Sequence, residues 1–390
     1  MEPIKLVKDT IDKADIAALC EWLSQDETPR LTKGELTLHY EIAYAAKCDR
    51  KYGVFVSSGS NANLLAVYAL VASGAMRNNI VIAPALSWAT TVAPLVQFGL
   101  KPVLCDINAE DLSVEMNFLE ELFVKHQPAV FFLVSVLGMP PQKMTEIVDL
   151  CWKYGVILIM DNCESQNSKI HGRPLEKYGL MSTCSSYMGH ITSTIEGGMI
   201  TTDSTKLYHL LLMLRSHGWD RDLPEKEKLA LQMQWKVDDF NRLYTFYEAG
   251  FNVRSTEINA FLGLRQLKKL DYFTINRDNN FWHYDQLIIN SHWKPDIAKV
   301  CMVSNLGYPV IHPKRDAIIK ELIKNEVECR PLISGSMSNQ PFFKKSQGDQ
   351  RMPLAEHVQE AGLYIPNHPF LTKAEIRFIS DIINHFTDAD

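Results

Sequence analysis

The sequence predicts an α/β protein built on a mostly parallel sheet, and two observations carry this prediction. Short apolar runs, typical of buried strands, alternate with helical patterns over the first two thirds of the chain. After that point one long helical pattern leads into a smaller region of mixed strands and helices. We therefore expect a large domain over residues 1–255 and a small α+β domain over residues 256–390, entered by the long helix.

The elements follow in order along the chain. Expected strands cover residues 54–57, 80–88, 101–107, 129–138, 155–161 and 197–203 in the large domain, and 304–312 and 327–333 in the small one. Expected helices cover residues 64–75, 115–124, 143–153, 256–290 and 316–325. Strands that alternate with helices predict a parallel sheet covered on both faces. Such a sheet carries its chemistry at the carboxyl ends of its strands.

The composition is typical of a globular protein and gives no sign of a nucleic-acid-binding, membrane or secreted protein. The chain has 390 residues, of which 46% are hydrophobic and 22% charged, as in an ordinary water-soluble globular protein. A formal net charge of −6 gives no case for binding nucleic acid or a membrane surface. The first ten residues lack the apolar core of a signal peptide, and the apolar run 130–139 is too short to span a bilayer. The eight cysteines form no CxxC pair, so we expect reduced thiols and a cytoplasmic location.

Two motifs lie where strands end. "SSGSNAN" begins a helix, and the backbone N–H groups of Gly59 and Ser60 could bind a phosphate there, although small residues also cap ordinary helices. Asp161 ends the apolar run "ILIMD", where a carboxylate serves either as a helix cap or as a catalytic group.

The third motif is "SSYMGHITSTIEGG". Ser185 stands five residues before His190, and a Glu-Gly-Gly triplet begins six residues after that histidine. A single histidine is more often a structural or surface residue than a catalytic one, and this motif alone does not decide between them.

The motifs carry more weight in combination. In order, the chain contains "VSSGSNANLL", "PALSWATT", "DNCES", the serine–histidine motif, "HGWDRDLP", "GFNVR" and "ECRP". This series resembles the DegT/DnrJ/EryC1 family of sugar aminotransferases, which are pyridoxal-phosphate enzymes of fold type I. The resemblance extends from about residue 31 to residue 368, and it implies an aspartate-aminotransferase-like fold.

The resemblance assigns a role to each matching residue. It implies cofactor contacts at Gly59 and Ser60 (phosphate), Trp88 (beside the ring), Asp161 (pyridine nitrogen), Glu164 (near the ring), Ser185 (phosphate) and Asn252 (phosphate of the neighbouring subunit). It thus implies a homodimer with shared active sites. His217, Arg221 and Arg330 are candidates for binding the substrate, or else for surface ion pairs.

His190 stands where this family carries its Schiff-base lysine. An imidazole cannot hold the cofactor aldehyde as an amine does, so pyridoxal phosphate or pyridoxamine phosphate should bind non-covalently. The ring can still act as a base, so His190 and Asp161 are the expected catalytic residues. With a histidine at this position, the chain resembles the sugar-nucleotide 3-dehydratase branch of the family. A second histidine-bearing branch uses an iron–sulfur cluster, but residues 215–252 contain no cysteine, so we expect no cluster.

The branch implies an activity. The expected reaction removes the C3 hydroxyl of a nucleotide-linked 4-keto-6-deoxyhexose, with GDP-4-keto-6-deoxymannose as the expected substrate and glutamate as the amino donor. Two alternatives remain at this point: an aminotransferase whose lysine has been replaced, and a family member without catalytic activity.

Overall fold

A seven-stranded sheet forms the centre of the protein. The computed structural model describes residues 2–289 and 293–386. The strand order is β1-β9-β8-β5-β4-β2-β3, in which only β9 runs antiparallel to its neighbours. The strands are β1 (Tyr52–Val56), β2 (Ile80–Pro84), β3 (Lys101–Cys105), β4 (Val130–Val134), β5 (Ile157–Asp161), β8 (Met181–Ser185) and β9 (Gly198–Thr202). Every residue of β4, β8 and β9 is buried, so both faces of the sheet are covered, as predicted.

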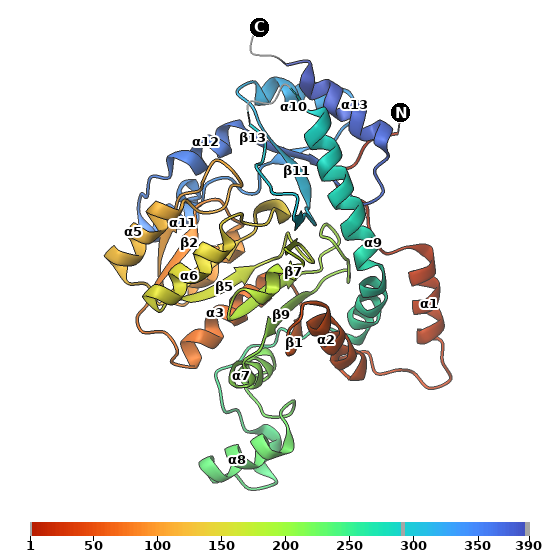
Figure 1. The fold of residues 1–390 in the computed structure, drawn as a ribbon. Coiled ribbons are helices and arrows are strands. Elements are labelled where there is room, and N and C mark those ends of the chain that lie inside the picture. Colours follow the sequence, from red (N-terminus) through yellow and green to blue (C-terminus); the bar gives the residue numbers. More distant parts are fainter. Residues whose placement is uncertain (1, 290–292, 387–390) are drawn as a thin grey trace.

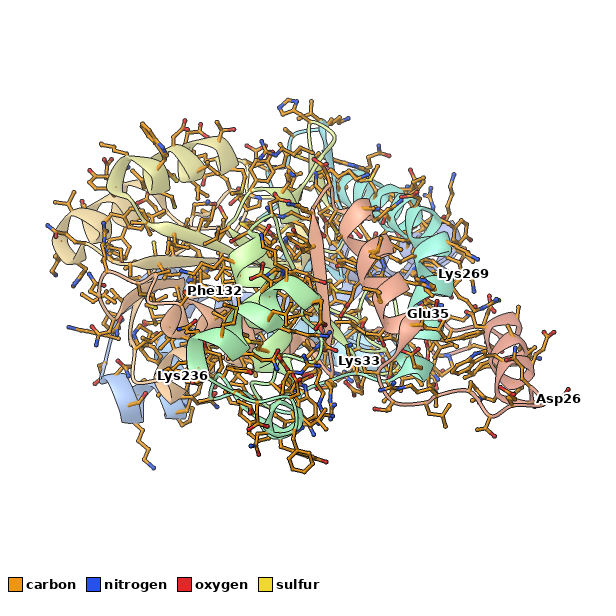
Figure 2. All side chains as sticks on the ribbon, turned by 90° about the horizontal axis from the view of Figure 1, so that it is seen from below. Asp26, Lys33, Glu35, Phe132, Lys236 and Lys269 are labelled. Atoms are coloured by element: carbon orange, nitrogen blue, oxygen red, sulfur yellow. The ribbon has the colours of Figure 1, made fainter. Side chains whose placement is uncertain are left out.

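Helices pack around this sheet, and the long helix α9 leads from it to the C-terminal part of the chain (Figure 1). They are α1 (Lys13–Leu23), α2 (Glu35–Lys47), α3 (Gly59–Ala72), α4 (Ala89–Gln97), α5 (Met116–His126), α6 (Met144–Tyr154), α7 (Thr205–Arg215), α8 (Glu225–Trp235), α9 (Glu257–Leu287), α10 (Arg315–Lys324), α11 (Pro341–Gln347), α12 (Pro353–Ala361) and α13 (Lys373–Asn384). In Figure 2 Phe132 of β4, which is fully buried, lies inside the outline of the molecule, whereas Asp26 lies at its outer edge. No helix in the described ranges is long and apolar enough to cross a membrane.

Two smaller sheets complete the fold. One joins β11 (Gly307–Ile311), β13 (Gly362–Pro366) and β12 (Arg330–Pro331). The other joins β10 (Cys301–Met302) to β6 (Lys169–Ile170) and β7 (Arg173–Pro174). The N-terminal segment returns to the small domain, where Ile4 pairs in parallel with Val327. The proposed division at residue 255 stays a prediction.

Several predicted boundaries differ from the structure. The strand predicted over 129–138 ends at Val134, and a 3-10 turn follows because Leu137 and Gly138 have φ angles of 50° and 92°. The strand predicted over 327–333 shortens to β12. The long helix ends at Leu287; Asn290, its predicted end, lies outside the described residues. Neither β8 nor β13 is predicted.

Parallel strands bring the motifs to one edge. β1, β2, β5 and β8 point the same way, because β9 runs antiparallel to both β1 and β8. Their carboxyl ends therefore lie together, beside the first turn of α3, which begins directly after β1. The fold thus brings the Gly59–Ser60 turn, Asp161 and Ser185 together at one edge of the sheet.

A buried ion pair between Arg215 and Glu41 connects strand β1 to helices α2 and α7. The guanidinium of Arg215, at the end of α7, is fully buried and contacts the carboxylate of Glu41 in α2. It also donates to the Phe55 carbonyl at 2.9 Å, and Glu41 accepts from the Phe55 N–H at 2.8 Å. Two helices and β1 therefore share one charged contact.

We expect Arg215→Met to destabilise the protein, because it leaves the Glu41 carboxylate buried without its cation. Breaking a buried pair from one side costs about 3–5 kcal/mol, so the free energy of unfolding in urea should fall by about that amount. Lys153→Met, which breaks the exposed Lys153–Glu120 pair, is the control and should cost about 1 kcal/mol or less. Equal effects of the two variants would contradict the prediction.

Candidate active site

A cavity of about 1190 Å³ opens at the carboxyl edge of the large sheet. Its walls come from the strand ends, from the N-terminal segment 2–9 and from residues between 306 and 375 in the C-terminal part of the chain. Eight of the residues predicted from the sequence line it: Gly59, Ser60, Trp88, Asp161, Glu164, Ser185, His190 and Arg330. A space of this size admits a cofactor together with a large substrate.

Asp161 ends β5 and is only 4% exposed. Its carboxylate accepts hydrogen bonds from Asn63 Nδ2 and Thr91 Oγ1, each at 2.8 Å, and from the backbone N–H of Cys163 at 3.1 Å. Asn63 lies in α3 and Thr91 in α4, so three elements fix this carboxylate. Sequence reasoning missed both partners, although they stand in the two quoted motifs that end β1 and β2.

The start of α3 forms a cradle for an anion. Ser58 caps the helix by accepting from the Asn61 N–H, and the helix begins at Gly59. A Cβ atom on Gly59 would lie 2.6 Å from the Cβ of Ser185, so only glycine allows this approach. The N–H groups of a helix N-terminus and a serine hydroxyl are suitable donors for a phosphate. Ser60 lies beside them and donates to Thr90 at 3.0 Å.

Trp88 presents an aromatic surface in the same cavity. It precedes the first residue of α4 and is 54% exposed. An indole of this exposure can cover a planar ring. Together with the anion cradle and the buried carboxylate, it makes the residues present fit pyridoxal phosphate.

The contacts of His190 determine its tautomer. Its Nδ1 lies 2.6 Å from the backbone oxygen of Cys163. A carbonyl oxygen only accepts, so Nδ1 carries the proton and Nε2 of the neutral ring is bare. Burial lowers the pKa of His190 to about 4, although the Cys163 carbonyl and the Asp161 carboxylate act in the opposite direction. At neutral pH the ring is therefore an acceptor of protons.

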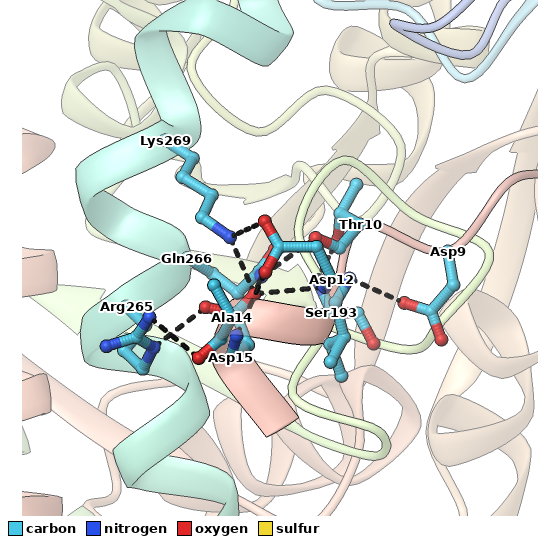
Figure 3. Close-up of polar contacts among 10 residues, drawn as sticks. Asp9, Thr10, Asp12, Ala14, Asp15, Ser193, Arg265, Gln266 and Lys269 are labelled. Atoms are coloured by element: carbon cyan, nitrogen blue, oxygen red, sulfur yellow. Dashed lines mark hydrogen bonds and ion pairs between the residues drawn. The ribbon is translucent and has the colours of Figure 1, made fainter. Parts of the chain in front are cut away.

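The segment that follows His190 is held from several sides. The Ser193 N–H donates to Thr10 Oγ1 at 3.1 Å, and Gln266 of α9 donates to the Thr10 carbonyl at 3.1 Å. Figure 3 shows this junction, where Asp15 also receives hydrogen bonds from α9. A guanidinium nitrogen of the buried Arg277 lies 3.4 Å from the His190 carbonyl. These contacts fix the backbone from which the imidazole projects.

The structure places the remaining predicted residues apart from this cavity. His217, Arg221 and Asn252 do not line it. Arg221 stacks over the Trp219 ring at 3.7 Å, and the Asn252 amide oxygen accepts from Arg254 at 3.1 Å. Their assigned roles stay predictions. Sequence reasoning missed the N-terminal segment 2–9 as a wall of the cavity, since no motif marks it.

Comparison with known proteins places the chain in a family. Residues 9–384 match the DegT/DnrJ/EryC1/StrS aminotransferase family, and the chain belongs to it. It is 33% identical to a GDP-4-keto-6-deoxy-D-mannose 3-dehydratase of Yersinia pseudotuberculosis, over 97% of both chains. The structure resembles that of the Escherichia coli enzyme of the same name with bound hydrated pyridoxal phosphate, with a TM-score of 0.87 and 30% identity over 97% of this chain and 99% of that one.

A second solved structure of a GDP-4-keto-6-deoxymannose-3-dehydratase holds a trapped adduct of pyridoxal phosphate and glutamate. It matches with a TM-score of 0.87 and 29% identity, over 97% of this chain and all of that one. The predicted fold and the predicted family are therefore confirmed. The fit of the cavity to pyridoxal phosphate agrees with the cofactor in these structures. Among the described residues, no group of histidine, cysteine and acidic side chains is arranged to hold a metal ion.

We expect His190 to titrate far below the ordinary histidine pKa in the cofactor-free protein. Proton NMR of the imidazole, assigned with His190→Gln, should give a pKa near 4. The folded state then binds fewer protons than the unfolded state between about pH 6.5 and 4, so wild-type stability should fall relative to His190→Gln as the pH drops through this range. A pKa of His190 at or above 6.5 would contradict the assigned environment.

Proposed function

We propose that this chain is a pyridoxal-phosphate-dependent 3-dehydratase of nucleotide-linked sugars. Its substrate is GDP-4-keto-6-deoxy-D-mannose, glutamate is the amino donor, and the product is a 3,6-dideoxy-4-keto sugar of the kind used in lipopolysaccharide O antigens. The observation that carries the proposal is a neutral histidine, with a bare Nε2, at the position where the family carries its lysine. The relatives that support it bear the name of this reaction.

In this proposal different residues of the chain bind the cofactor, keep its ring protonated and accept the substrate proton. When bound, pyridoxal phosphate and its amine form supply the nitrogen that joins the sugar ketone and a ring that withdraws electrons. The first turn of α3 and Ser185 bind the phosphate, and Trp88 covers the ring. Asp161, held by Asn63 and Thr91, keeps a proton on the pyridine nitrogen. His190 Nε2 accepts a proton from the carbon next to the reacting nitrogen.

The imidazole also explains why deoxygenation replaces amination. A lysine amine would recapture the cofactor in a covalent bond. His190 cannot form that bond, so the deoxygenated product leaves and loses its nitrogen to water as ammonia. The cofactor stays bound through its phosphate and its ring alone.

The decisive experiment supplies purified protein with pyridoxal phosphate, glutamate and GDP-4-keto-6-deoxy-D-mannose. We expect equimolar ammonia and a sugar product lighter by one oxygen atom, measured by mass spectrometry. His190→Asn should lower this rate by about 10²–10⁴-fold, the usual contribution of a positioned base. An amino sugar as the product would instead identify an aminotransferase, and no turnover of this substrate would contradict the proposed function.

We also propose that the chain works as a homodimer with shared active sites, in the cytoplasm. The segment around α8 projects from the large domain (Figure 1). It exposes apolar side chains, among them Met233 at 80%, Phe240 at 83% and Tyr244 at 76%. Exposed apolar surface of this extent is typical of an interface. Asn252 follows the segment and lies outside its own cavity, which suits a residue that serves the partner's phosphate.

A complementation test checks the shared site. Asn252→Ala and His190→Asn should each be nearly inactive alone, the first because phosphate binding weakens. In a mixed dimer one site contains both substitutions and the other contains neither, so mixing the two variants should restore part of the activity. Equilibrium dialysis should show weaker cofactor binding by Asn252→Ala. Mixing without recovery, or an active monomer in sedimentation, would contradict the proposal.

A further inference from the structure

Two ionisable side chains of the cavity are perturbed in opposite directions. Burial raises the pKa of Glu164 to about 8, and the nearby Asp161 carboxylate adds to the effect. Burial lowers the pKa of His190 to about 4. At neutral pH the Glu164 carboxyl group is therefore protonated, while the imidazole of His190 is neutral and can accept a proton. Pairs of groups whose environments separate their pKa values in this way divide acid and base roles in enzymes.

The geometry supports this division. Both groups are anchored on the turn after β5: His190 Nδ1 bonds the Cys163 carbonyl, and Glu164 is the next residue. Glu164 Oε2 accepts the Leu137 N–H at 2.7 Å. That contact is the only hydrogen bond of this carboxyl group, and no lysine or arginine pairs with it, among the residues that the structure describes. The second oxygen is free to act in the cavity, which Glu164 lines.

The backbone around Glu164 is closely fitted. The Leu137 N–H belongs to the 3-10 turn that follows β4, where Leu137 and Gly138 have positive φ angles. A Cβ atom on Gly138 would lie 2.7 Å from the Glu164 carbonyl oxygen. The turn therefore fixes Glu164 at its backbone and at one carboxyl oxygen together.

We propose that Glu164 is the general acid of the dehydration and donates its proton to the C3 hydroxyl as that group leaves. The proposal rests on the proposed function and adds a second catalytic residue to it. His190 enters the step neutral, with no proton on Nε2. When the C–H and C–O bonds break together, the departing hydroxide, a poor leaving group, must therefore take its proton from another side chain.

The proton balance of the step is complete. A carbon–hydrogen bond breaks, and its proton goes to His190 Nε2. The electron pair moves toward C3, whose bond to oxygen breaks with its pair on the oxygen. The Glu164 proton joins this oxygen, so water leaves and Glu164 becomes a carboxylate. Proton exchange with solvent then returns both side chains to their starting forms.

The other groups near Glu164 suit this role. The negative charge of Asp161 helps to raise the pKa of Glu164, and Asp161 itself is held by Asn63, Thr91 and the Cys163 N–H. Tyr364 of β13 also lines the cavity, and burial, reinforced by Glu164, raises its pKa to about 12. The tyrosine hydroxyl is therefore a far weaker acid than Glu164.

The test compares Glu164→Gln, which fills the same space without an acidic proton, with Glu121→Gln, the same change at an exposed residue of α5 outside the cavity, which should leave the rate unchanged. In Glu164→Gln the dehydration rate should fall by about 10²-fold or more. The glutamate half-reaction, followed by 2-oxoglutarate, needs no departing hydroxyl and should fall far less. Glu164→Asp keeps an acid and should retain more dehydration than Glu164→Gln. Equal losses in both reactions would overturn the acid role.

A second readout does not need turnover. Infrared difference spectra between wild type and Glu164→Gln should show a protonated carboxyl group at pH 7 that ionises near pH 8. If the amide variant does not fold, Glu164→Asp supplies the difference spectrum. A carboxylate already ionised at pH 6 would overturn the proposal even if the wild-type enzyme is an active dehydratase. Wild-type protein without dehydratase activity would overturn the proposed function instead.

Discussion

The active site depends on the buried carboxylate of Asp161. Its three hydrogen bonds come from α3, from α4 and from the turn that follows β5, so one side chain fixes the relative positions of these elements. The same elements carry the phosphate turn, the Trp88 indole and the Cys163 carbonyl that orients His190. A group bound against Asp161 is therefore placed, without further adjustment, against an anion cradle, an aromatic face and a base.

The carbonyl of Cys163 determines which nitrogen of His190, the residue at the family's lysine position, carries the proton. An imidazole without a partner could present either nitrogen to the cavity, with or without its proton. The contact at 2.6 Å assigns the proton to Nδ1 and leaves Nε2 as an acceptor. Burial then keeps the ring neutral. The backbone of the β5 turn thus leaves Nε2 of a neutral imidazole as a proton acceptor facing the site, as the proposed role of His190 as a base requires.

Part of the site could be predicted from the sequence, because some of its residues stand at the ends of recognisable strands. Apolar strands that end at a glycine turn and at an aspartate predict one functional edge, and Gly59 and Asp161 do line one cavity. Ser185 and His190, which the resemblance singled out, line the same cavity. β8 escaped prediction because "MSTCS" is small and polar, and its burial comes from neighbouring strands. The protonation of Glu164 and the wall formed by residues 2–9 depend on packing between distant segments, which no local pattern encodes.

The cavity is lined by residues from the N-terminal and the C-terminal parts of the chain. One buried side chain, Arg277, contacts both parts. Arg277 of α9 donates to the carbonyls of Asn367 at 2.8 Å and Asn305 at 3.1 Å, and its other nitrogen lies 3.4 Å from the His190 carbonyl. The first two carbonyls lie close to strands β13 and β11 of the small sheet, and the third belongs to His190. A desolvated cation whose partners are backbone oxygens is costly to move, because every displacement loses hydrogen bonds that buried groups cannot replace with water. Arg277 thus links the residues beside the small sheet, whose β12 and β13 supply Arg330 and Tyr364 to the cavity, to the backbone of His190.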